Sequence, residues 1–188
     1  NDRSEVDRLV SALQAIAARY APQVASPGAD MGIRDLASRE PDDELYREVV
    51  LDHYLHPAGR DPLPDAQIEW SGKNPLCGDE VTLRLKVINE RIEGIQVLGH
   101  GCSVSVASGS MLASQLKGRT VDEGRRLLRG LKAMLKGEPL PADLDMGDLV
   151  ALEGLKNLPV RVKCALLPWT TFEEGIGHSH EGCDHGHD

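Results

Sequence analysis

The sequence predicts an α+β fold in which a three-stranded antiparallel sheet packs against several helices. Between residues 67 and 98 hydrophobic residues alternate with polar ones, which is the period of a strand with one buried face. On both sides of this region hydrophobic residues recur every three or four positions, which is the period of an amphipathic helix. One run of strands followed by a run of helices is typical of α+β proteins, in which helices cover one face of an antiparallel sheet.

A helix is expected before the strands, opening at Pro41 and ending before Pro57. Proline is tolerated in the first turn of a helix, and the acidic residues 42–44 interact favourably with its positive end. We expect His53 at the edge of the core. The buried stripe of this helix is predicted to contain Leu45, Val49, Val50 and His53.

Three strands are expected next. Ile68 and Trp70 indicate a short first strand, and the second has the clearest alternation. Asn89 and Glu90 form a turn into a third strand over residues 92–98, which makes the last two strands a hairpin. The inward-facing residues of the second strand are Val81, Leu83, Leu85 and Val87.

Four helical segments are expected after the strands. The first follows Cys102 and stops at Gly118. The second opens with the capping box Thr120-x-x-Glu123 and ends at Gly137. A short helix capped by Asp145 and a final helix from about Pro159 complete the set, with the remaining core side chains at Met111, Leu112, Leu128, Leu131, Leu135, Leu149, Leu152, Leu167 and Phe172.

We divide the chain into three parts at residues 1–41, 42–176 and 177–188. The first part is predicted to contain an amphipathic helix over residues 3–20 and a linker broken by proline and glycine. We expect this part either to pack against the rest of the chain or to extend into solvent, with a contact to a partner protein as the alternative. The last part is His-rich, and two interpretations stay open, a metal-collecting tail and a solvated, disordered end. Its metal-binding side chains are His178, His180, Cys183, His185 and His187.

Composition excludes several classes of function. The formal net charge is −9, which argues against electrostatic binding to nucleic acid or to anionic membranes, and six aromatic residues are too few for base-stacking platforms. The N-terminus lacks the pattern of a secretion signal, and no apolar run is long enough to cross a bilayer. We therefore expect a cytoplasmic protein whose four cysteines are metal ligands or reactive thiols rather than disulfides.

The chemistry is predicted to lie where two loops meet. Cys77 and Asp79 lie in a turn just before the second strand, and Cys102 follows its hairpin partner, so the hairpin brings all three to one end of the sheet. Cys164, near the start of the last helix, can complete the set. Three thiolates and one carboxylate suit a tetrahedral zinc ion. The alternative is that the cysteines are small buried hydrophobic residues and that Asp79 caps a turn.

The neighbours of these cysteines favour the metal or reactive-thiol interpretation. Each lies at an element boundary beside glycine, serine or charged residues, and Cys102 and Cys164 lie near helix starts, where the helix dipole stabilises a thiolate. Zinc with three thiolates and Asp79 carries a formal charge of about −2. We therefore expect a cation nearby and choose Arg161, one helical turn before Cys164, although a plain surface arginine is the alternative.

Four segments follow one another in the sequence: LYREVVLDHYLHP, NPLCGDEVTLRLKV, GHGCSVSVASGSML and DMGDLVALEGLKNLPVRVKC. Together they resemble the IscU/NifU-type iron-sulfur assembly superfamily, and most closely its SufU branch, over residues 44–176. An additional helical segment over residues 120–136 and Lys163 in place of a histidine favour the SufU branch over IscU-type scaffolds. The resemblance implies the IscU/SufU-like fold.

The resemblance implies a zinc-dependent sulfur-transfer protein that accepts sulfane sulfur from a PLP-dependent cysteine desulfurase of the SUF system (SufS-type). Cys77 would accept the sulfur after a desulfurase histidine replaces it on zinc. Arg161 matches the family's arginine and would steady the freed thiolate, and a SUF scaffold complex is a further candidate partner. The implied zinc ligands are Cys77, Asp79, Cys102 and Cys164.

Two alternative functions use the same residues. Three thiolates and Asp79 can also hold a [2Fe-2S] cluster, which would make the protein an IscU-like scaffold. A zinc-stabilised adaptor without transfer chemistry is the other alternative. A zinc hydrolase or deaminase is disfavoured, because the four protein ligands leave no open position and no H-x-E motif accompanies them.

Overall fold

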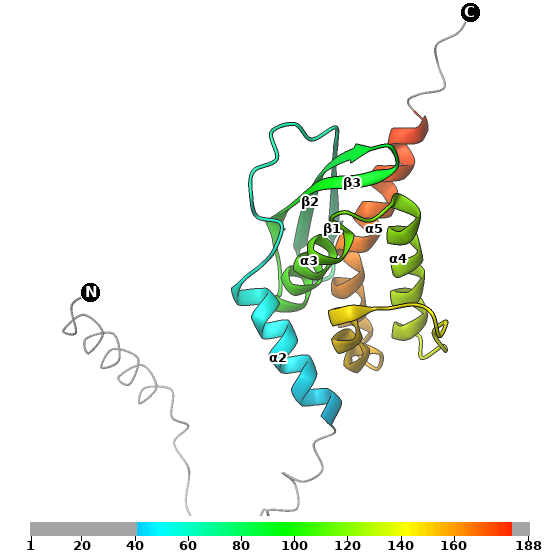
Figure 1. Ribbon diagram of the computed structural model, residues 1–188. Coiled ribbons are helices and arrows are strands. Elements are labelled where there is room, and N and C mark those ends of the chain that lie inside the picture. The colour runs from blue at the N-terminus through cyan, green and yellow to red at the C-terminus, as the bar shows by residue number, and fades with distance from the viewer. Residues whose placement is uncertain (1–40, 182–188) are drawn as a thin grey trace, which may run out of the picture. The chain divides into compact units, whose positions relative to one another are not determined.

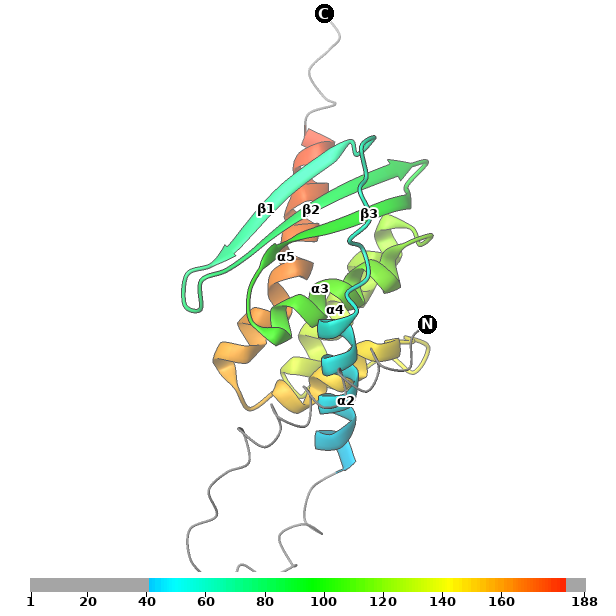
Figure 2. The same cartoon turned by 90° about the vertical axis from the view of Figure 1, so that its left-hand side faces the viewer.

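The computed structural model describes residues 41–181 and confirms the predicted α+β class. The helix expected over residues 3–20 lies outside the described part of the chain. Residues 182–188 lie outside it as well. Figures 1 and 2 show one sheet with helices gathered on one of its faces. The elements are α2 (Pro41–Leu55), β1 (Ile68–Asn74), β2 (Asp79–Ile88), β3 (Arg91–His100), α3 (Ser103–Leu116), α4 (Val121–Leu135), the 3-10 helix η2 (Gly147–Leu155) and α5 (Pro159–Glu181).

The sheet has the order β1-β2-β3 and is antiparallel throughout, as predicted. Asn89 and Glu90 both have positive φ, at 50° and 61°, which is the backbone of a tight hairpin turn between β2 and β3. Alternate β2 residues are buried against the helices, and the opposite face carries polar cross-strand pairs such as Ser71 with Thr82 at 2.7 Å. This alternation fixes the register, because a slip of one residue would turn the apolar face outward.

The core lies between the inner face of the sheet and helices α3, α4 and α5. Trp169 and Phe172 of α5 are fully buried, together with leucines of α3, α4 and β2. Ser108 of α3 links two partners in this core: its hydroxyl donates to the Ala165 carbonyl at 2.6 Å and accepts from Trp169 Nε1 at 3.2 Å. Because buried polar groups must be paired, these bonds fix how α3 lies against α5.

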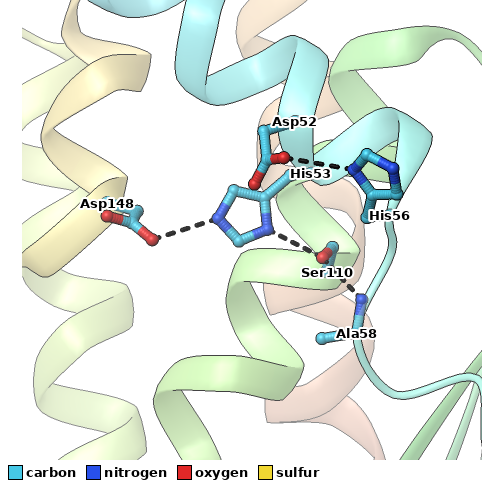
Figure 3. Close-up of polar contacts among 6 residues, drawn as sticks. All are labelled: Asp52, His53, His56, Ala58, Ser110 and Asp148. Carbon is cyan, nitrogen blue, oxygen red and sulfur yellow. Dashed lines mark hydrogen bonds and ion pairs between the residues drawn. The ribbon is translucent and has the colours of Figure 1, made fainter.

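Helix α2 is attached through His53, whose side chain is 11% exposed (Figure 3). Its Nε2 lies 3.1 Å from Asp148 Oδ2, and its Nδ1 lies 2.8 Å from Ser110 Oγ. Since a carboxylate only accepts, Nε2 donates to Asp148, while Nδ1 forms its hydrogen bond with the Ser110 hydroxyl. Ser110 Oγ in turn accepts from the Ala58 amide at 2.8 Å. One side chain therefore joins α2 to α3 and η2, which agrees with its expected place at the core edge.

Two elements differ in detail from the sequence prediction. The segment after Asp145 is a 3-10 helix whose N-cap residue is Met146 rather than the predicted Asp145, although Asp145 Oδ1 accepts from the Gly147 amide at 2.9 Å. Helix α5, for which the sequence predicted only the start, continues through Pro168 to Glu181 and so enters the His-rich part. Trp70 of β1 contacts its last turns, because its ring stacks on His178 at 4.3 Å and its Nε1 donates to Glu174.

Helix α5 is also the longest element between residues 41 and 181, at 23 residues. It mixes apolar side chains with charged and polar ones such as Lys163, Glu173 and Glu174. In this part of the chain no helix combines the length and apolarity that a membrane span requires.

Candidate metal centre

The predicted ligands lie on segments that meet at one end of the sheet. Asn74 of β1 pairs with Asp79 of β2, and Glu80 of β2 pairs with His100 of β3, so the β1–β2 turn and the β3–α3 loop reach the same end. Cys102 immediately precedes α3, and Cys164 lies in α5. Figure 2 shows the start of α3 and the β1–β2 turn at this end.

The β1–β2 turn is closed by its own backbone. The Asn74 carbonyl accepts from the Gly78 amide at 2.8 Å and from the Cys77 amide at 3.3 Å. Gly78 has φ of +71°, a conformation that costs a side-chain-bearing residue free energy. The turn therefore holds Cys77 out of the core, and its side chain is exposed.

Three of the four predicted ligands form one tight group. The ligand atoms of Cys77, Asp79 and Cys164 all lie within 4.8 Å of one another. Cys77 Sγ lies 3.0 Å from Cys164 Sγ and 3.5 Å from Asp79 Oδ2. Cys102 is outside this group but adjoins it, because its Sγ lies 3.5 Å from the same Asp79 oxygen. The carboxylate of Asp79 is thus the common neighbour of Cys77 and Cys102.

Asp79 is buried, with 1% of its surface exposed, yet its pKa is lowered. Burial alone would raise the pKa, because it disfavours the charged form. Hydrogen bonds outweigh this effect: the Cys102 amide donates to Oδ1 at 3.0 Å, and the thiols of Cys164, Cys102 and Cys77 contribute further. Asp79 is therefore held as a carboxylate, the form that binds a cation.

Cys164 has the opposite shift. Its side chain is 1% exposed, and burial raises the pKa of its thiol well above the ordinary value, with hydrogen bonds to Cys77, Asp79 and Cys102 acting in the same direction. In the absence of a cation this sulfur is held protonated. A metal that binds here must displace that proton, so metal affinity depends on pH.

Asn74 is a site residue that sequence reasoning missed. It is 6% exposed, and its side-chain Nδ2 lies 2.8 Å from Cys77 Sγ and 3.6 Å from Cys164 Sγ. Its Oδ1 accepts from the Leu76 amide at 3.2 Å, which leaves the NH₂ group directed at the sulfurs. The available signal was its place in the NPLCGD segment, but asparagine before proline is also an ordinary turn residue.

Arg161 lies one turn before Cys164 in α5, as predicted, and its side chain is exposed. Within residues 41–181 it makes no hydrogen bond or ion pair with the three cysteines or Asp79. Lys163, next to Cys164, is exposed as well. The function of Arg161 as the counter-charge of a metal centre stays a prediction.

The donor set fits a tetrahedral zinc site. With zinc–sulfur bonds of about 2.3 Å, neighbouring sulfurs of a regular tetrahedron lie about 3.8 Å apart. The two sulfur–oxygen separations of 3.5 Å are close to this edge length, whereas the sulfurs of Cys77 and Cys164, at 3.0 Å, lie closer together than in such a site, and Cys102 adjoins the group only through Asp79. Thiolates with one carboxylate are also the donors that zinc accepts, whereas magnesium and calcium prefer oxygen alone.

Comparison with known proteins adds an independent finding. The model of the NifU-like N terminal domain family matches residues 45–165. The chain is 35% identical over 140 residues to the zinc-dependent sulfurtransferase SufU of Bacillus subtilis, which covers 74% of this chain and 95% of that protein. It is 36% identical over 135 residues to the iron-sulfur cluster assembly scaffold protein IscU of Thermotoga maritima, covering 70% and 92%.

Solved structures agree with these matches. A crystal structure described as an iron-sulfur cluster assembly scaffold for the SUF system, from Fervidobacterium islandicum AW-1, superimposes with a TM-score of 0.66 at 32% identity, covering 71% of this chain and 97% of that one. The N-terminal part of a NifU-like protein from Brucella abortus superimposes with a TM-score of 0.65 at 23% identity, which supports the fold.

Proposed function

Since the chain belongs to the NifU-like N-terminal domain family, we propose that it acts in iron-sulfur cluster assembly by accepting sulfur on Cys77 from the persulfide of a cysteine desulfurase. Zinc would be held by Cys77, Asp79, Cys102 and Cys164. One observation carries the proposal: of the three converging sulfurs, Cys77 is exposed while Cys164 is buried and Cys102 is half-buried. This difference supports a site in which two sulfurs retain the metal and Cys77 is released. The similarity to a protein named as a zinc-dependent sulfurtransferase supports it.

The proposed transfer is a thiol–persulfide exchange. The Cys77 thiolate attacks the outer sulfur of the desulfurase persulfide, a new sulfur–sulfur bond forms on Cys77, and the desulfurase cysteine leaves as a thiolate. The sulfane sulfur moves without net oxidation or reduction, so no other reactant is needed. Bound zinc would supply a deprotonated sulfur at neutral pH.

The chain's own residues prepare Cys77 for this step. Its exposed turn is followed by Gly78, which has a positive φ. Because glycine has no Cβ, the backbone at this position can change conformation when the loop moves. The amide of Asn74 donates to the Cys77 sulfur and reaches Cys164 as well, so it helps to hold both sulfurs in position. Arg161, exposed one turn before Cys164, is predicted to stabilise the released thiolate.

The surroundings of the site fit a protein partner. Leu76 precedes Cys77 and is 61% exposed; Leu158, just before α5, and Val160, in its first turn, are 51% and 54% exposed. Exposed apolar side chains on the segments that carry the ligands indicate a surface that another protein covers. We propose a SufS-type, PLP-dependent cysteine desulfurase as that protein.

The second candidate is a scaffold on which a [2Fe-2S] cluster is assembled. The same three cysteines and Asp79 would be adequate ligands, and the similarity to the Thermotoga maritima scaffold supports it. Stable cluster assembly in anaerobic reconstitution, with an absorbing chromophore that persists against zinc, would favour it. A structural zinc adaptor is the third candidate, and it predicts that loss of Cys77 lowers stability without changing sulfur flow.

The decisive experiment combines native mass spectrometry with desulfurase kinetics. We expect about one zinc per full chain and faster sulfide or persulfide turnover when the chain is added to a SufS-type desulfurase with cysteine. Cys77→Ser should remove the acceleration, whereas Cys183→Ser, which changes the same residue type outside the described part, should keep it. A zinc-loaded wild-type chain that leaves turnover unchanged would refute sulfur transfer.

A further inference from the structure

The three sulfurs of the candidate metal centre are not equivalent in their neighbours. Cys77 Sγ lies 3.0 Å from Cys164 Sγ. Cys102 Sγ instead contacts Asp79 Oδ2 at 3.5 Å, and it lies outside the group formed by Cys77, Asp79 and Cys164. The fold thus brings one particular pair of cysteines together, from positions 87 residues apart in the sequence.

We propose that Cys77 and Cys164 form a reversible disulfide when no metal is bound and a peroxide is present. The pair must shorten its sulfur–sulfur distance by about 1 Å to reach a bond of about 2.05 Å. The movable partner is Cys77, because it lies in an exposed turn followed by Gly78 with φ of +71°. Cys164 is fixed in the buried wall of α5.

Exposure sets the order of the two steps. Hydrogen peroxide reaches Cys77, whose sulfur takes one oxygen to form a sulfenic acid while the O–O bond breaks and water is released. Cys164 is protonated at this stage, so its sulfur gives up the proton as it attacks Cys77 Sγ; the S–O bond breaks, and the sulfenic oxygen leaves with that proton as a second water. In total two thiols lose two electrons and two protons, and one peroxide becomes two waters. A dithiol reductant reverses the reaction by exchange.

The disulfide would have two consequences for the chain. It occupies two of the four predicted metal ligands, so the oxidised chain cannot hold the metal with its full ligand set. It also protects Cys77 from irreversible oxidation to the sulfinic acid, because the sulfenic acid is consumed first. The inference rests on distances and exposure rather than on sulfur transfer, so a negative desulfurase assay would leave it unaffected.

The test is peptide mapping of the full chain after oxidation. Metal-free and zinc-loaded protein are treated with hydrogen peroxide, alkylated, digested and analysed by mass spectrometry. We expect a mass loss of about 2 Da and a Cys77–Cys164 cross-link in the metal-free chain, both reversed by dithiothreitol. The zinc-loaded chain should form the link at least about tenfold more slowly, since metal engages both sulfurs.

Variants distinguish this pair from others. Cys102→Ser and Cys183→Ser should keep the cross-link, whereas Cys164→Ser should carry sulfinic acid on Cys77 instead. Circular dichroism checks that each variant is folded. If Cys164→Ser is not folded, the peptide maps of the metal-free and zinc-loaded wild-type chain test the proposal instead. A dominant Cys77–Cys102 link, overoxidation of Cys77 in the metal-free wild type, or equal rates with and without zinc would overturn the proposal.

Discussion

The side-chain amide of Asn74 donates a hydrogen bond to the sulfur of Cys77 at 2.8 Å, from a position three residues earlier in the chain. The same amide reaches Cys164 Sγ, 90 residues away, at 3.6 Å. Asn74 ends β1 and pairs with Asp79 at the start of β2. One buried polar side chain therefore links the strand pair, the exposed cysteine and the buried cysteine.

Asn74→Ala is expected to weaken zinc binding by about 10- to 100-fold, the range typical of losing a hydrogen bond to a metal ligand. The variant removes the donor to two sulfurs without changing any predicted ligand. Competition against a chromophoric chelator measures the affinity. Asn157→Ala, at an exposed position, is the matched control and should bind zinc like the wild type. Equal affinity of both variants would contradict the role of Asn74.

Gly101→Ala is expected to disturb the site through Asp79. A Cβ at residue 101 would lie 2.9 Å from Asp79 Cγ, so the carboxylate would have to move. We expect lower zinc content by native mass spectrometry. Gly177→Ala is the control, because a Cβ there meets nothing within 4 Å and the exchange in a helix favours folding by about 0.5–1 kcal/mol. Full zinc content in Gly101→Ala would show that Asp79 can shift without loss of the metal.

The metal-free chain is expected to lose stability in acid partly through Asp79. Its pKa is lowered in the folded state, because hydrogen bonds to the carboxylate outweigh its burial. The contribution is therefore complete above the unfolded-state pKa of about 3.9 and is lost as the pH falls through the lower folded-state value. Urea denaturation across this pH range measures the free energy of unfolding of the wild type and of Asp79→Asn. This free energy should change less with pH in the variant. Identical slopes of the free energy of unfolding against pH in the two proteins would count against a contribution from Asp79.

Zinc affinity is expected to fall as the pH is lowered from neutral. Burial raises the pKa of the Cys164 thiol, so zinc must compete with a firmly held proton. Isothermal titration calorimetry in buffers of different ionisation enthalpy counts the protons released on binding. We expect at least one released proton at neutral pH in the wild type and fewer in Cys164→Ser. Binding without proton release would be incompatible with a protonated Cys164 in the metal-free chain.

His53→Ala is expected to lower the free energy of unfolding by about 1–3 kcal/mol, because it removes two hydrogen bonds and buried ring area. The bonds join α2 to Ser110 of α3 and Asp148 of η2 (Figure 3). Chemical denaturation measures the change. His56→Ala is the matched control: His56 follows the end of α2 and is exposed, and within residues 41–181 its side chain pairs only with Asp52, so we expect a change within about 0.5 kcal/mol. Similar losses in both would contradict a linking role for His53.

Local sequence signals predicted the elements because each signal acts within a few residues. The alternation of Val81, Leu83 and Leu85 sets the buried face of β2, and Thr120 and Glu123 form the predicted capping box at the start of α4. No end of α5 was predicted from the sequence, and the contact on its last turns is distant: Trp70 of β1 stacks on His178. A helix end that depends on a contact across a hundred residues leaves no local pattern.

For the site, the sequence by itself determined the types of donor and the turn that exposes Cys77. The hairpin also made it predictable that Cys77, Asp79 and Cys102 would meet at one sheet end. Only the tertiary structure decided that Cys164 approaches Cys77 to 3.0 Å while Cys102 adjoins Asp79 instead. It alone directed the Asn74 amide at the sulfurs. The physical reason is that the position of Cys164 beside Cys77 and Asn74 depends on how α5 packs against the sheet, and that packing is the sum of many weak apolar contacts rather than the property of any one segment.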